Sequence, residues 1–338
     1  MTAGLLASDR PLAEVYDMAL VDLDGVTYTG HEPIPYAAEG LVAARAMGLR
    51  TVFVTNNASR SPSAVAEQLS SLDIPATADD VMTSAQSAAR LLATRLARGA
   101  KVLVVGADAL REAVRAEGFV VVGSADDEPA AVAQGYGPEI GWPQLAEAAY
   151  AIERGAWHVA SNLDRSLPTA RGLAPGNGSL VLAVQSATGV TPDSAGKPEP
   201  TMYRLAVDRA GGGNALVVGD RLDTDLAGAR AGGFAGLHVL TGVSTTRDDI
   251  LAAATYRPSY LGTDLRSLLE PHPRPERSAE GWWTCRGAAA RVTEGALDLD
   301  GQGGTPLDLV RAACAAAWEA ADDGRPVDAS RVAELPVA

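Results

Sequence analysis

Cysteine and aromatic residues are scarce in this chain, and each shortage excludes a class of protein. The two cysteines among 338 residues, Cys285 and Cys314, fit neither a zinc-binding spacing nor a disulfide framework. Aromatic side chains account for only 5% of the residues, although 47% of the residues are hydrophobic. We therefore expect a packed core built mainly from Ala, Val and Leu.

Basic charge is scarce as well, and long apolar runs are missing. The formal net charge is -14 at pH 7, which disfavours a nucleic-acid partner because the phosphate backbone requires a basic face. The apolar runs are too short to span a membrane, and residues 1–10 lack the basic and apolar regions of a signal peptide. We therefore expect a soluble cytoplasmic protein with no nucleic-acid partner and no membrane insertion.

Lysine is the rarest charged residue. The 28 basic residues include lysine only at Lys101 and Lys197, and the others are arginine. Lys101 begins an apolar run and has the pattern of an ordinary surface lysine. Lys197 stands in the loop Gly196–Pro198, where we expect a compact point charge to be needed. The histidines show no metal-ligand spacing and are expected to be structural or solvated; they are His31, His158, His238 and His272.

Two acidic residues follow directly after an apolar segment near the N-terminus. Residues 18–21 predict a buried strand of a parallel sheet, and Asp22 and Asp24 come next. Because side chains two apart on a strand point the same way, both carboxylates are expected to face one site. Close carboxylates repel unless a cation or a proton lies between them. The pair therefore indicates a metal site, an acid/base couple or both, and an incidental acidic turn is the alternative.

Three later segments carry polar side chains in comparable places. A second predicted strand is followed by Thr55–Asn57, whose side chains suit either the binding of phosphoryl oxygens or the capping of the next helix. Lys197 supplies an ammonium group in a loop. A later strand is followed by Asp220 and Asp225. In open α/β sheets, ligands bind beyond the carboxyl ends of the strands, where these side chains would meet.

These segments, in this order, resemble the motifs of the haloacid dehalogenase-like hydrolases. The resemblance runs from residue ~15 to residue ~265 and is most specific in Thr55–Ser59, Gly196–Pro198 and Asp220–Asp225. Their form is similar to the subgroup that contains NagD-like nucleotidases, p-nitrophenyl phosphatases and phosphoglycolate phosphatases. The Arg-rich and Ala-rich composition, together with a C-terminal extension, is similar to actinobacterial glycerol-3-phosphate phosphatases.

The resemblance implies a role for each acidic residue. Asp22 would be the nucleophile that attacks phosphorus and forms an aspartyl phosphate. Asp24 would protonate the leaving alcohol and then take a proton from the attacking water. This second acid is absent from the dehalogenases, so it favours phosphoryl transfer over carbon–halogen cleavage. Mg²⁺ would be held by Asp22, the main-chain carbonyl of Asp24 and Asp220, with Asp225 coordinating it directly or supporting a ligand.

The order of predicted elements indicates an α/β fold with three parts. Residues 1–84 and 190–270 predict a Rossmann-like catalytic core with a parallel sheet. Residues 85–189 lie where the subgroup inserts an α/β cap domain that closes over the site and selects the substrate. Residues 271–277 predict a linker, and residues 278–338 a small α+β appendage. We expect helices at 35–47, 84–98, 107–118, 144–154, 201–210 and 306–322, and strands at 51–55, 101–106, 120–122, 130–132, 157–160, 216–220, 281–286, 288–292 and 296–299.

The resemblance also implies which residues hold the phosphoryl group and the substrate. Thr55, Asn56 and Lys197 would stabilise charge on the phosphoryl oxygens in the transition state, with Asn57 beside them. In the cap, two polar segments are similar to substrate-facing stretches of capped relatives, and their residues are Asn162, Asp164, Arg165, Gly176 and Asn177. An ordinary polar loop and a Gly-Asn-Gly turn are the alternatives, and Arg165 could pair with Asp164.

The sequence therefore predicts a Mg²⁺-dependent phosphatase acting on a small phosphorylated metabolite, with glycerol 3-phosphate as the best candidate. Phosphoglycolate and nucleoside monophosphates are alternative substrates. A phosphotransferase or mutase would carry the same motifs, and a binding or regulatory protein on the same fold is the non-enzymatic alternative. The appendage is expected to pack on the core, with homodimer formation and regulation as its other candidate roles.

Overall fold

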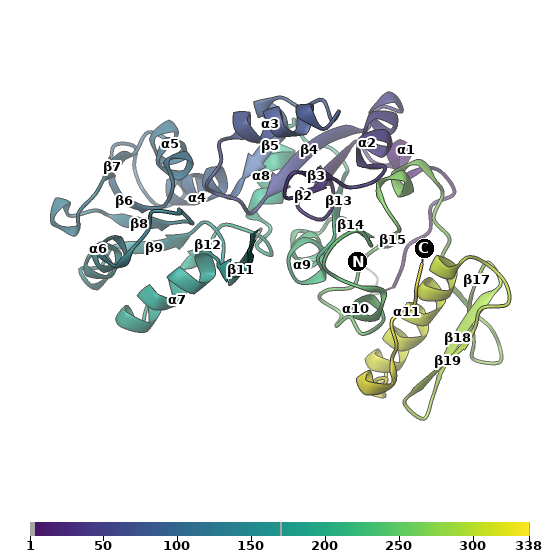
Figure 1. Ribbon diagram of the computed structural model, residues 1–338. Helices are drawn as coiled ribbons and strands as arrows, with labels where there is room; N and C mark the ends of the chain where they lie inside the picture. Colours follow the sequence, from purple (N-terminus) through teal and green to yellow (C-terminus); the bar gives the residue numbers. More distant parts are fainter. Residues whose placement is uncertain (1–3, 170, 338) are drawn as a thin grey trace. The chain divides into compact units, whose positions relative to one another are not determined.

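The computed structural model describes residues 4–169 and 171–337, and the chain divides into two compact units (Figure 1). Unit 1 holds the chain up to Val52, the segment Leu72–Ile74 and the chain from Gly211 onward. Unit 2 holds Phe53–Ser71 and Pro75–Ala210. The boundary falls inside strand β4 (Arg50–Thr55), so the first half of this strand belongs to unit 1 and the second half to unit 2.

Unit 1 is built on a parallel sheet. Strand β1 (Met18–Val21) lies between the first half of β4 and β13 (Ala215–Gly219), and β14 (Ala235–Val239) and β15 (Tyr260–Gly262) follow beyond β13. Every residue of β1 and β13 is buried, as expected for strands of a parallel sheet that is covered on both faces. The two strands pair in register up to Val21 and Val218, so the residues that follow them lie at one end of the sheet.

Short helices and turns surround this sheet. One of them, α2 (Ala37–Ala46), packs so closely on a 3-10 turn that a Cβ at Gly40 would lie 2.7 Å from the carbonyl carbon of Leu265. Glycine is therefore required in the middle of this helix. The remaining elements of this part are α1 (Leu12–Val15), β2 (Tyr28–Thr29), β3 (Glu32–Pro33), a π-helical turn (Leu222–Leu226), α9 (Ala227–Gly232), α10 (Thr246–Ile250) and the 3-10 turn (Leu265–Leu269).

The appendage is an antiparallel meander with one long helix packed against it. The strands β16 (Glu276–Arg277), β17 (Trp283–Cys285), β18 (Ala288–Thr293) and β19 (Ala296–Asp300) pair in chain order, and α11 (Pro306–Asp322) follows. Thr305 begins this helix with a capping box to Asp308. The predicted helix at 306–322 is confirmed, whereas the predicted linker at 271–277 ends in strand β16 because its last two residues pair with β17.

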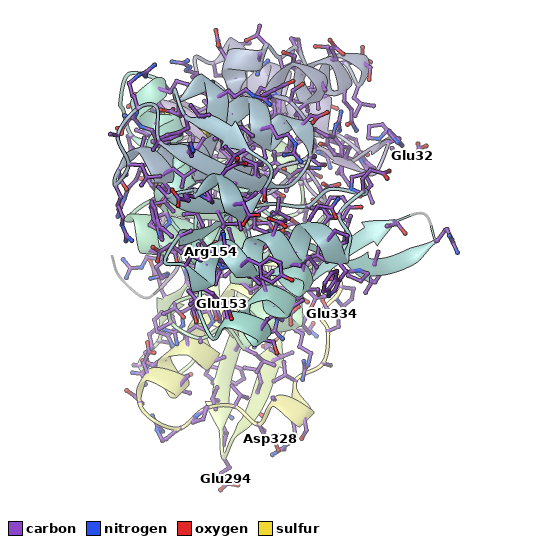
Figure 2. The ribbon with its side chains drawn as sticks, turned by 90° about the vertical axis from the view of Figure 1, so that its left-hand side faces the viewer. Glu32, Glu153, Arg154, Glu294, Asp328 and Glu334 are labelled. Carbon is purple, nitrogen blue, oxygen red and sulfur yellow. The ribbon has the colours of Figure 1, made fainter. Side chains whose placement is uncertain are left out.

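The appendage shares a hydrophobic core with the rest of unit 1. Val310 and Trp318 on α11 lie in one buried cluster with Ile250 of α10 and Leu261 of β15. The tail after α11 returns along the meander, where the N–H of Asp328 donates to the carbonyl of Gly295 at 2.9 Å. Figure 2 shows the side chains of Glu294 and Asp328 at this end of the appendage. The expectation that the appendage packs on the core is therefore confirmed.

Unit 2 contains a second parallel sheet with helices on both faces. Its strands are ordered β12 (Asp193–Ser194), β9 (Trp157–Ala160), β8 (Ala131–Gln134), β6 (Lys101–Val105) and β7 (Val120–Val122). Val102 and Val104 of β6 pack in one hydrophobic cluster with α4 (Ser84–Ala93) and α5 (Asp108–Ala116). Leu103 and Val105 point the other way, into a cluster with α6 (Trp142–Glu153) and α7 (Asn177–Thr188).

The remaining elements of unit 2 lie outside this five-stranded sheet. The second half of β4 pairs with β5 (Val81–Thr83), and the hairpin β10 (Ser166–Thr169) and β11 (Gly172–Pro175) precedes α7. Helices α3 (Pro62–Ser71) and α8 (Thr201–Arg209) and the 3-10 turns Ala78–Asp80 and Ala125–Asp127 complete the unit.

The predicted α/β fold with parallel sheets is confirmed, and the helix expected at 84–98 is the one that departs most from its predicted bounds. The helix expected at 84–98 ends at Ala93 because the N–H of Thr94 bonds back only three residues, to Leu91, and Gly99 then turns the chain with a φ of 85°. In the part of the chain that the structure describes, no helix combines the length and apolar character needed to cross a membrane.

Candidate active site

Two aspartates of unit 1 follow neighbouring strands of its sheet. Asp22 comes directly after β1, and its N–H donates to the carbonyl of Val218 on β13 at 2.9 Å. Asp220 comes directly after β13 and is fully buried. Because β1 and β13 are parallel and in register, both carboxylates stand at the carboxyl end of the sheet, where ligands bind in open α/β folds.

A third aspartate reaches the same place from the π-helical turn. Asp225 is only 1% exposed, and its carboxylate accepts a hydrogen bond from the N–H of Arg221 at 3.3 Å. The strand comes very close to this side chain, since a Cβ at Gly219 would lie 2.2 Å from the Cβ of Asp225. Glycine at position 219 is therefore needed for Asp225 to occupy this site.

The three aspartates form a cluster suited to a divalent cation. Carboxylate oxygens of Asp22, Asp220 and Asp225 all lie within 4.8 Å of one another. Burying Asp220 and Asp225 this close together would be unfavourable without a compensating positive charge. Hard carboxylate oxygens are the ligands that Mg²⁺ prefers, so this cluster fits the predicted metal. Asp24 is exposed, and its predicted main-chain contact with the metal stays a prediction.

A loop that the sequence did not indicate holds Asp220 in place. The N–H of Val243 donates to Oδ2 of Asp220 at 2.7 Å, and the N–H of Ser244 donates to its main-chain carbonyl at 3.0 Å. The same loop reaches the segment after β1, because the hydroxyl of Thr241 donates to the carbonyl of Gly25 at 2.5 Å. Gly242 allows this approach, since a Cβ there would lie 1.9 Å from Oδ2 of Asp220.

A fully buried histidine also contacts the segment that carries Asp220. Nδ1 of His238 lies 2.9 Å from Asp249, and Nε2 lies 3.2 Å from the carbonyl oxygen of Asp220. Both ring nitrogens therefore face oxygen atoms, and a protonated imidazole can donate to both. Burial works to lower the pKa of His238, but the charge and hydrogen bond of Asp249 and the bond to Asp220 raise this pKa overall. His238 is structural, as predicted for the histidines, yet it is directly connected to the candidate metal site.

In unit 2, Asn56 is the centre of a second polar group. Its side-chain oxygen accepts a hydrogen bond from the N–H of Lys197 at 2.8 Å, and its side-chain nitrogen donates to the carbonyl of Lys197 at 3.3 Å. The same nitrogen lies 3.1 Å from the carboxylate of Asp164. Lys197 is only 4% exposed. Asn56 therefore fixes the main chain of a buried lysine.

Two asparagines of the predicted substrate-facing segments join this group. Asn162 donates from its side chain to the carbonyl of Asn56 at 2.8 Å, and Asn177 donates to the carbonyl of Asn162 at 2.8 Å. Gly176 leaves room for neighbouring main chain, since a Cβ there would lie 2.3 Å from the carbonyl oxygen of Asp164. Four predicted residues therefore lie together with Asn56 and Lys197 within unit 2; they are Asn162, Asp164, Gly176 and Asn177.

Three other predicted residues have different surroundings. The hydroxyl of Thr55 accepts from the N–H of Asn57 at 3.1 Å, and the side chain of Asn57 accepts from the N–H and the hydroxyl of Ser59 at 2.8 and 2.9 Å. Asn57 therefore shapes the turn that leads to α3. Arg165 is exposed, and its main-chain carbonyl accepts from the N–H of Gly176 at 2.9 Å.

Comparison with known protein families identifies the family of this chain. Models of the families described as haloacid dehalogenase-like hydrolase and HAD-hydrolase-like match residues 19–120 and 194–268. The chain belongs to the haloacid dehalogenase-like hydrolases. A third model, of a GCN5-related N-acetyltransferase like domain, matches residues 285–335 in the appendage.

Among relatives, the chain is 47% identical to D-glycerol 3-phosphate phosphatase of Mycobacterium tuberculosis, over 92% of this chain and 88% of the relative. It is 37% identical to a 5'-nucleotidase of Bacillus subtilis, over 68% of this chain and 90% of the relative. The crystal structure of the glycerol phosphate phosphatase of M. tuberculosis in complex with magnesium has a TM-score of 0.85, with 46% identity and 92% of each chain covered. The p-nitrophenyl phosphatase from Archaeoglobus fulgidus has a TM-score of 0.70, with 30% identity over 75% of this chain and 98% of that one.

Proposed function

We propose that this protein is a Mg²⁺-dependent phosphatase that hydrolyses a small phosphomonoester through an aspartyl phosphate on Asp22. The observation that carries this proposal is the cluster of Asp22, Asp220 and Asp225, in which two of the three carboxylates are buried. Mg²⁺ bound there would offset the repulsion between the anionic nucleophile and the anionic substrate. Names of phosphatases among the relatives, and a relative's structure with magnesium, support the same reaction and metal.

The reaction uses Asp22 and Asp24 in turn. A carboxylate oxygen of Asp22 attacks phosphorus, and the bond from phosphorus to the leaving oxygen breaks while Asp24 gives that oxygen a proton. Water then attacks the aspartyl phosphate, Asp24 takes the proton from the water, and phosphate leaves with Asp22 restored. The exposure of Asp24, beside a partly buried Asp22, is consistent with a group that exchanges protons with substrate and water.

Lys197, Thr55 and Asn56 are proposed to stabilise the transferring phosphoryl group. Charge on the phosphoryl oxygens is best stabilised by donors that are held in place before the reaction. The burial of Lys197 and the two hydrogen bonds between its main chain and Asn56 support such a role. Asn56 would then act partly by positioning Lys197, while Asn57 would shape the turn beside it.

The substrate is proposed to be glycerol 3-phosphate, selected by a cap at residues 85–189. The similarity to D-glycerol 3-phosphate phosphatase extends over 92% of this chain and supports this substrate. Within the cap, the substrate-facing residues would be Asn162, Asp164, Arg165, Gly176 and Asn177. A nucleoside monophosphate is the second candidate, because a 5'-nucleotidase is also among the relatives. Phosphoglycolate, or transfer of the phosphoryl group to another acceptor, is less well supported.

The cellular setting is part of the same proposal. Glycerol 3-phosphate as substrate would place the enzyme in glycerophospholipid metabolism in the cytoplasm. The formal net charge of -14 supports the absence of a nucleic-acid partner. Homodimer formation remains a proposal to be tested by the mass of the protein in solution.

Phosphate release from a panel of phosphomonoesters, with Mg²⁺ and with EDTA, tests the proposed function. The panel holds glycerol 3-phosphate, phosphoglycolate, UMP, pyridoxal phosphate and p-nitrophenyl phosphate. We expect Mg²⁺-dependent release, with glycerol 3-phosphate giving the highest kcat/KM. A higher kcat/KM for UMP would favour the nucleotidase, and a new phosphoester in place of phosphate would identify a transferase. No turnover of any ester by folded protein would contradict the proposal.

A further inference from the structure

The appendage contacts the short helix α10, which follows directly after the loop that holds Asp220. The indole N–H of Trp318 on α11 donates to the main-chain carbonyl of Asp249 at 2.9 Å, and both residues are buried. Helices α10 and α11 lie side by side in unit 1 (Figure 1). With only five residues, α10 is too short to be stable without such partners.

The tail after α11 holds the beginning of the same helix. The N–H of Thr246 donates to the carboxylate of Glu334 at 2.9 Å. The guanidinium of Arg247 donates to the carbonyls of Val332 and Ala329 at 2.9 and 2.7 Å. Both ends of α10 are therefore fixed by residues that come after position 300.

Two sets of hydrogen bonds connect α10 with Asp220. The side chain of Asp249 bonds to Nδ1 of His238, whose Nε2 donates to the carbonyl of Asp220. The loop that enters α10 carries Val243, whose N–H bonds to the carboxylate of Asp220. The loop directly before α10 carries the N–H groups of Val243 and Ser244, and Asp249 of α10 contacts the imidazole of His238 on β14; all three groups contact Asp220.

We propose that the appendage is a positioning element for the metal-binding carboxylates, acting from Trp318 through Asp249 and His238 on Asp220. This inference rests on the proposed function, because it assumes that Asp220 binds Mg²⁺. Groups that orient metal ligands typically change metal affinity by about 10- to 100-fold when they are removed. Trp318 does not contact Asp220 itself but acts through Asp249 and His238. Loss of its hydrogen bond is therefore expected to change Mg²⁺ affinity by a smaller factor.

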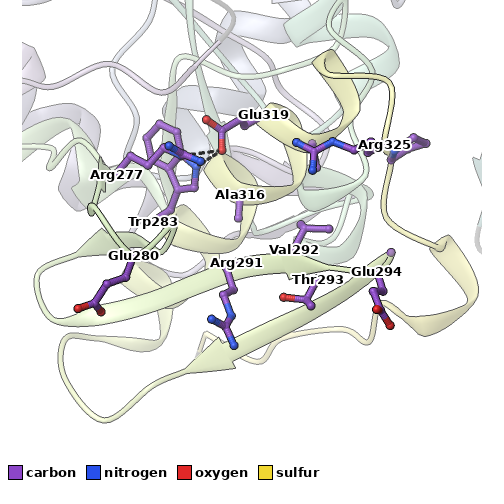
Figure 3. A pocket seen from close by; sticks show the side chains of 14 residues that line it. Arg277, Glu280, Trp283, Arg291, Val292, Thr293, Glu294, Ala316, Glu319 and Arg325 are labelled. Atoms are coloured by element: carbon purple, nitrogen blue, oxygen red, sulfur yellow. Dashed lines mark hydrogen bonds and ion pairs between the residues drawn. The ribbon is translucent and has the colours of Figure 1, made fainter.

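The other face of α11 supplies the contrast. The appendage contains a hollow of about 510 Å³. It is lined by Trp283 and several charged side chains (Figure 3). Its arginines face carboxylates: Arg277 with Glu319 at 3.0 Å, Arg291 with Asp298 at 3.1 Å and Arg325 with Asp323 at 2.9 Å. The indole N–H of Trp283 donates to Glu319 at 3.0 Å, on the residue next to Trp318. Trp283 thus makes the same kind of bond as Trp318 without leading to Asp220.

This pair of tryptophans gives a matched test. Trp318→Phe removes the indole N–H and keeps an aromatic ring in the core, and Trp283→Phe does the same in the hollow. The dissociation constant for Mg²⁺ is measured by titration calorimetry on each full-length protein without substrate. We expect Trp318→Phe to raise the dissociation constant about three- to tenfold, in keeping with the loss of one buried hydrogen bond, and Trp283→Phe to leave it unchanged.

A second pair separates positioning from a general loss of structure. Asp249→Asn retains an acceptor for the Nδ1–H of His238, whereas Asp249→Ala removes it. We expect the Asn variant to retain Mg²⁺ affinity within about twofold and the Ala variant to lose tenfold or more.

The outcomes are distinguishable. Unchanged affinity in Trp318→Phe, or equal weakening in Trp318→Phe and Trp283→Phe, would overturn the positioning role while leaving the proposed phosphatase intact. A wild-type protein that binds no Mg²⁺ would instead contradict the proposed function, and the positioning role with it.

Discussion

The cluster of polar side chains in unit 1 differs in charge and composition from the cluster in unit 2. In unit 1, three carboxylates gather at the ends of parallel strands, and main-chain N–H groups and a histidine hold one of them in place. In unit 2, asparagine side chains bond to main chain around a single buried lysine. An anionic cluster is suited to a cation, and a buried ammonium group held by asparagine side chains is suited to an anion. The comparison therefore supports the proposed metal-binding role of the carboxylates of unit 1 and the proposed phosphate-binding role of Lys197 in unit 2.

Among changes in unit 2, replacing Lys197 is expected to lower kcat the most. Lys197→Met should lower kcat by about 100- to 1000-fold, the usual loss when one preorganised group that stabilises the transition state is removed. The dissociation constant for Mg²⁺ should change much less than kcat, because the three carboxylates proposed to bind the metal are retained. The control is Lys101→Met, which removes an exposed lysine whose ammonium group donates to the carbonyl of Asp127. Phosphate release by both variants checks this prediction, and a similar loss in both would contradict it.

In unit 1, a single added methyl group should disturb the proposed metal site. In Gly242→Ala, the new Cβ would lie 1.9 Å from Oδ2 of Asp220, so this carboxylate must move. We expect Mg²⁺ affinity to fall about tenfold or more, with activity partly restored by a higher Mg²⁺ concentration. Gly123→Ala, where nothing lies within 4 Å of the new methyl group, is the matched control. Activity of Gly242→Ala that is independent of Mg²⁺ concentration would count against the metal site.

A smaller loss is expected when the lysine keeps its charge but loses its support. Asn56→Ala removes both hydrogen bonds to the main chain of Lys197 and should lower kcat about tenfold with an unchanged Mg²⁺ dissociation constant. Asn57→Ala removes the bonds to Ser59, which do not involve the lysine, and should change kcat by less. If the two variants have equal kcat values, Asn56 has no special role in positioning the lysine.

Two buried histidines, His158 of unit 2 and His238 of unit 1, should contribute to the pH dependence of stability with opposite signs. In unit 2, burial lowers the pKa of His158 to about 4, so the unfolded chain binds a proton more readily below pH 6.5 and stability is lost as the pH falls. In unit 1, the raised pKa of His238 stabilises the fold at lower pH and is lost as the pH rises through that pKa. For His158→Gln, the loss of unfolding free energy between pH 7 and pH 5 should be smaller than in the wild type by about 2 kcal/mol. Urea unfolding at both pH values measures this difference, and an unchanged loss would contradict the assignment.

The sequence predicted the parts of the site that depend on local pattern. Asp22 and Asp220 each follow an apolar run, and runs of this kind form parallel strands that end at one edge of a sheet. Lys197 was indicated by its rarity. The C-terminal helix was predicted with its bounds correct, since Pro306 and the capping box of Thr305 are local signals.

Contacts between distant residues could not be predicted in the same way. Asn56 and Asp164 are 108 residues apart, and Trp318 and Asp249 are 69 apart, so no spacing relates them. His238 lies inside an apolar run, where only the fold shows that its ring faces Asp249 and Asp220. The end of α4 at Ala93 was missed because its Ala-rich sequence favours helix beyond the point at which the chain must turn towards β6.

The central claim is that Asp22 is the nucleophile of a Mg²⁺-dependent phosphatase, and replacing it tests this claim most directly. Asp22→Asn keeps the size of the side chain but removes its nucleophilic charge, and the measurement is phosphate release from glycerol 3-phosphate at saturating Mg²⁺. Because nucleophile and acid act as a unit, we predict a loss of about a thousandfold or more in kcat, in protein that is folded by circular dichroism. Hydrolysis by Asp22→Asn at the wild-type rate would contradict the proposed mechanism.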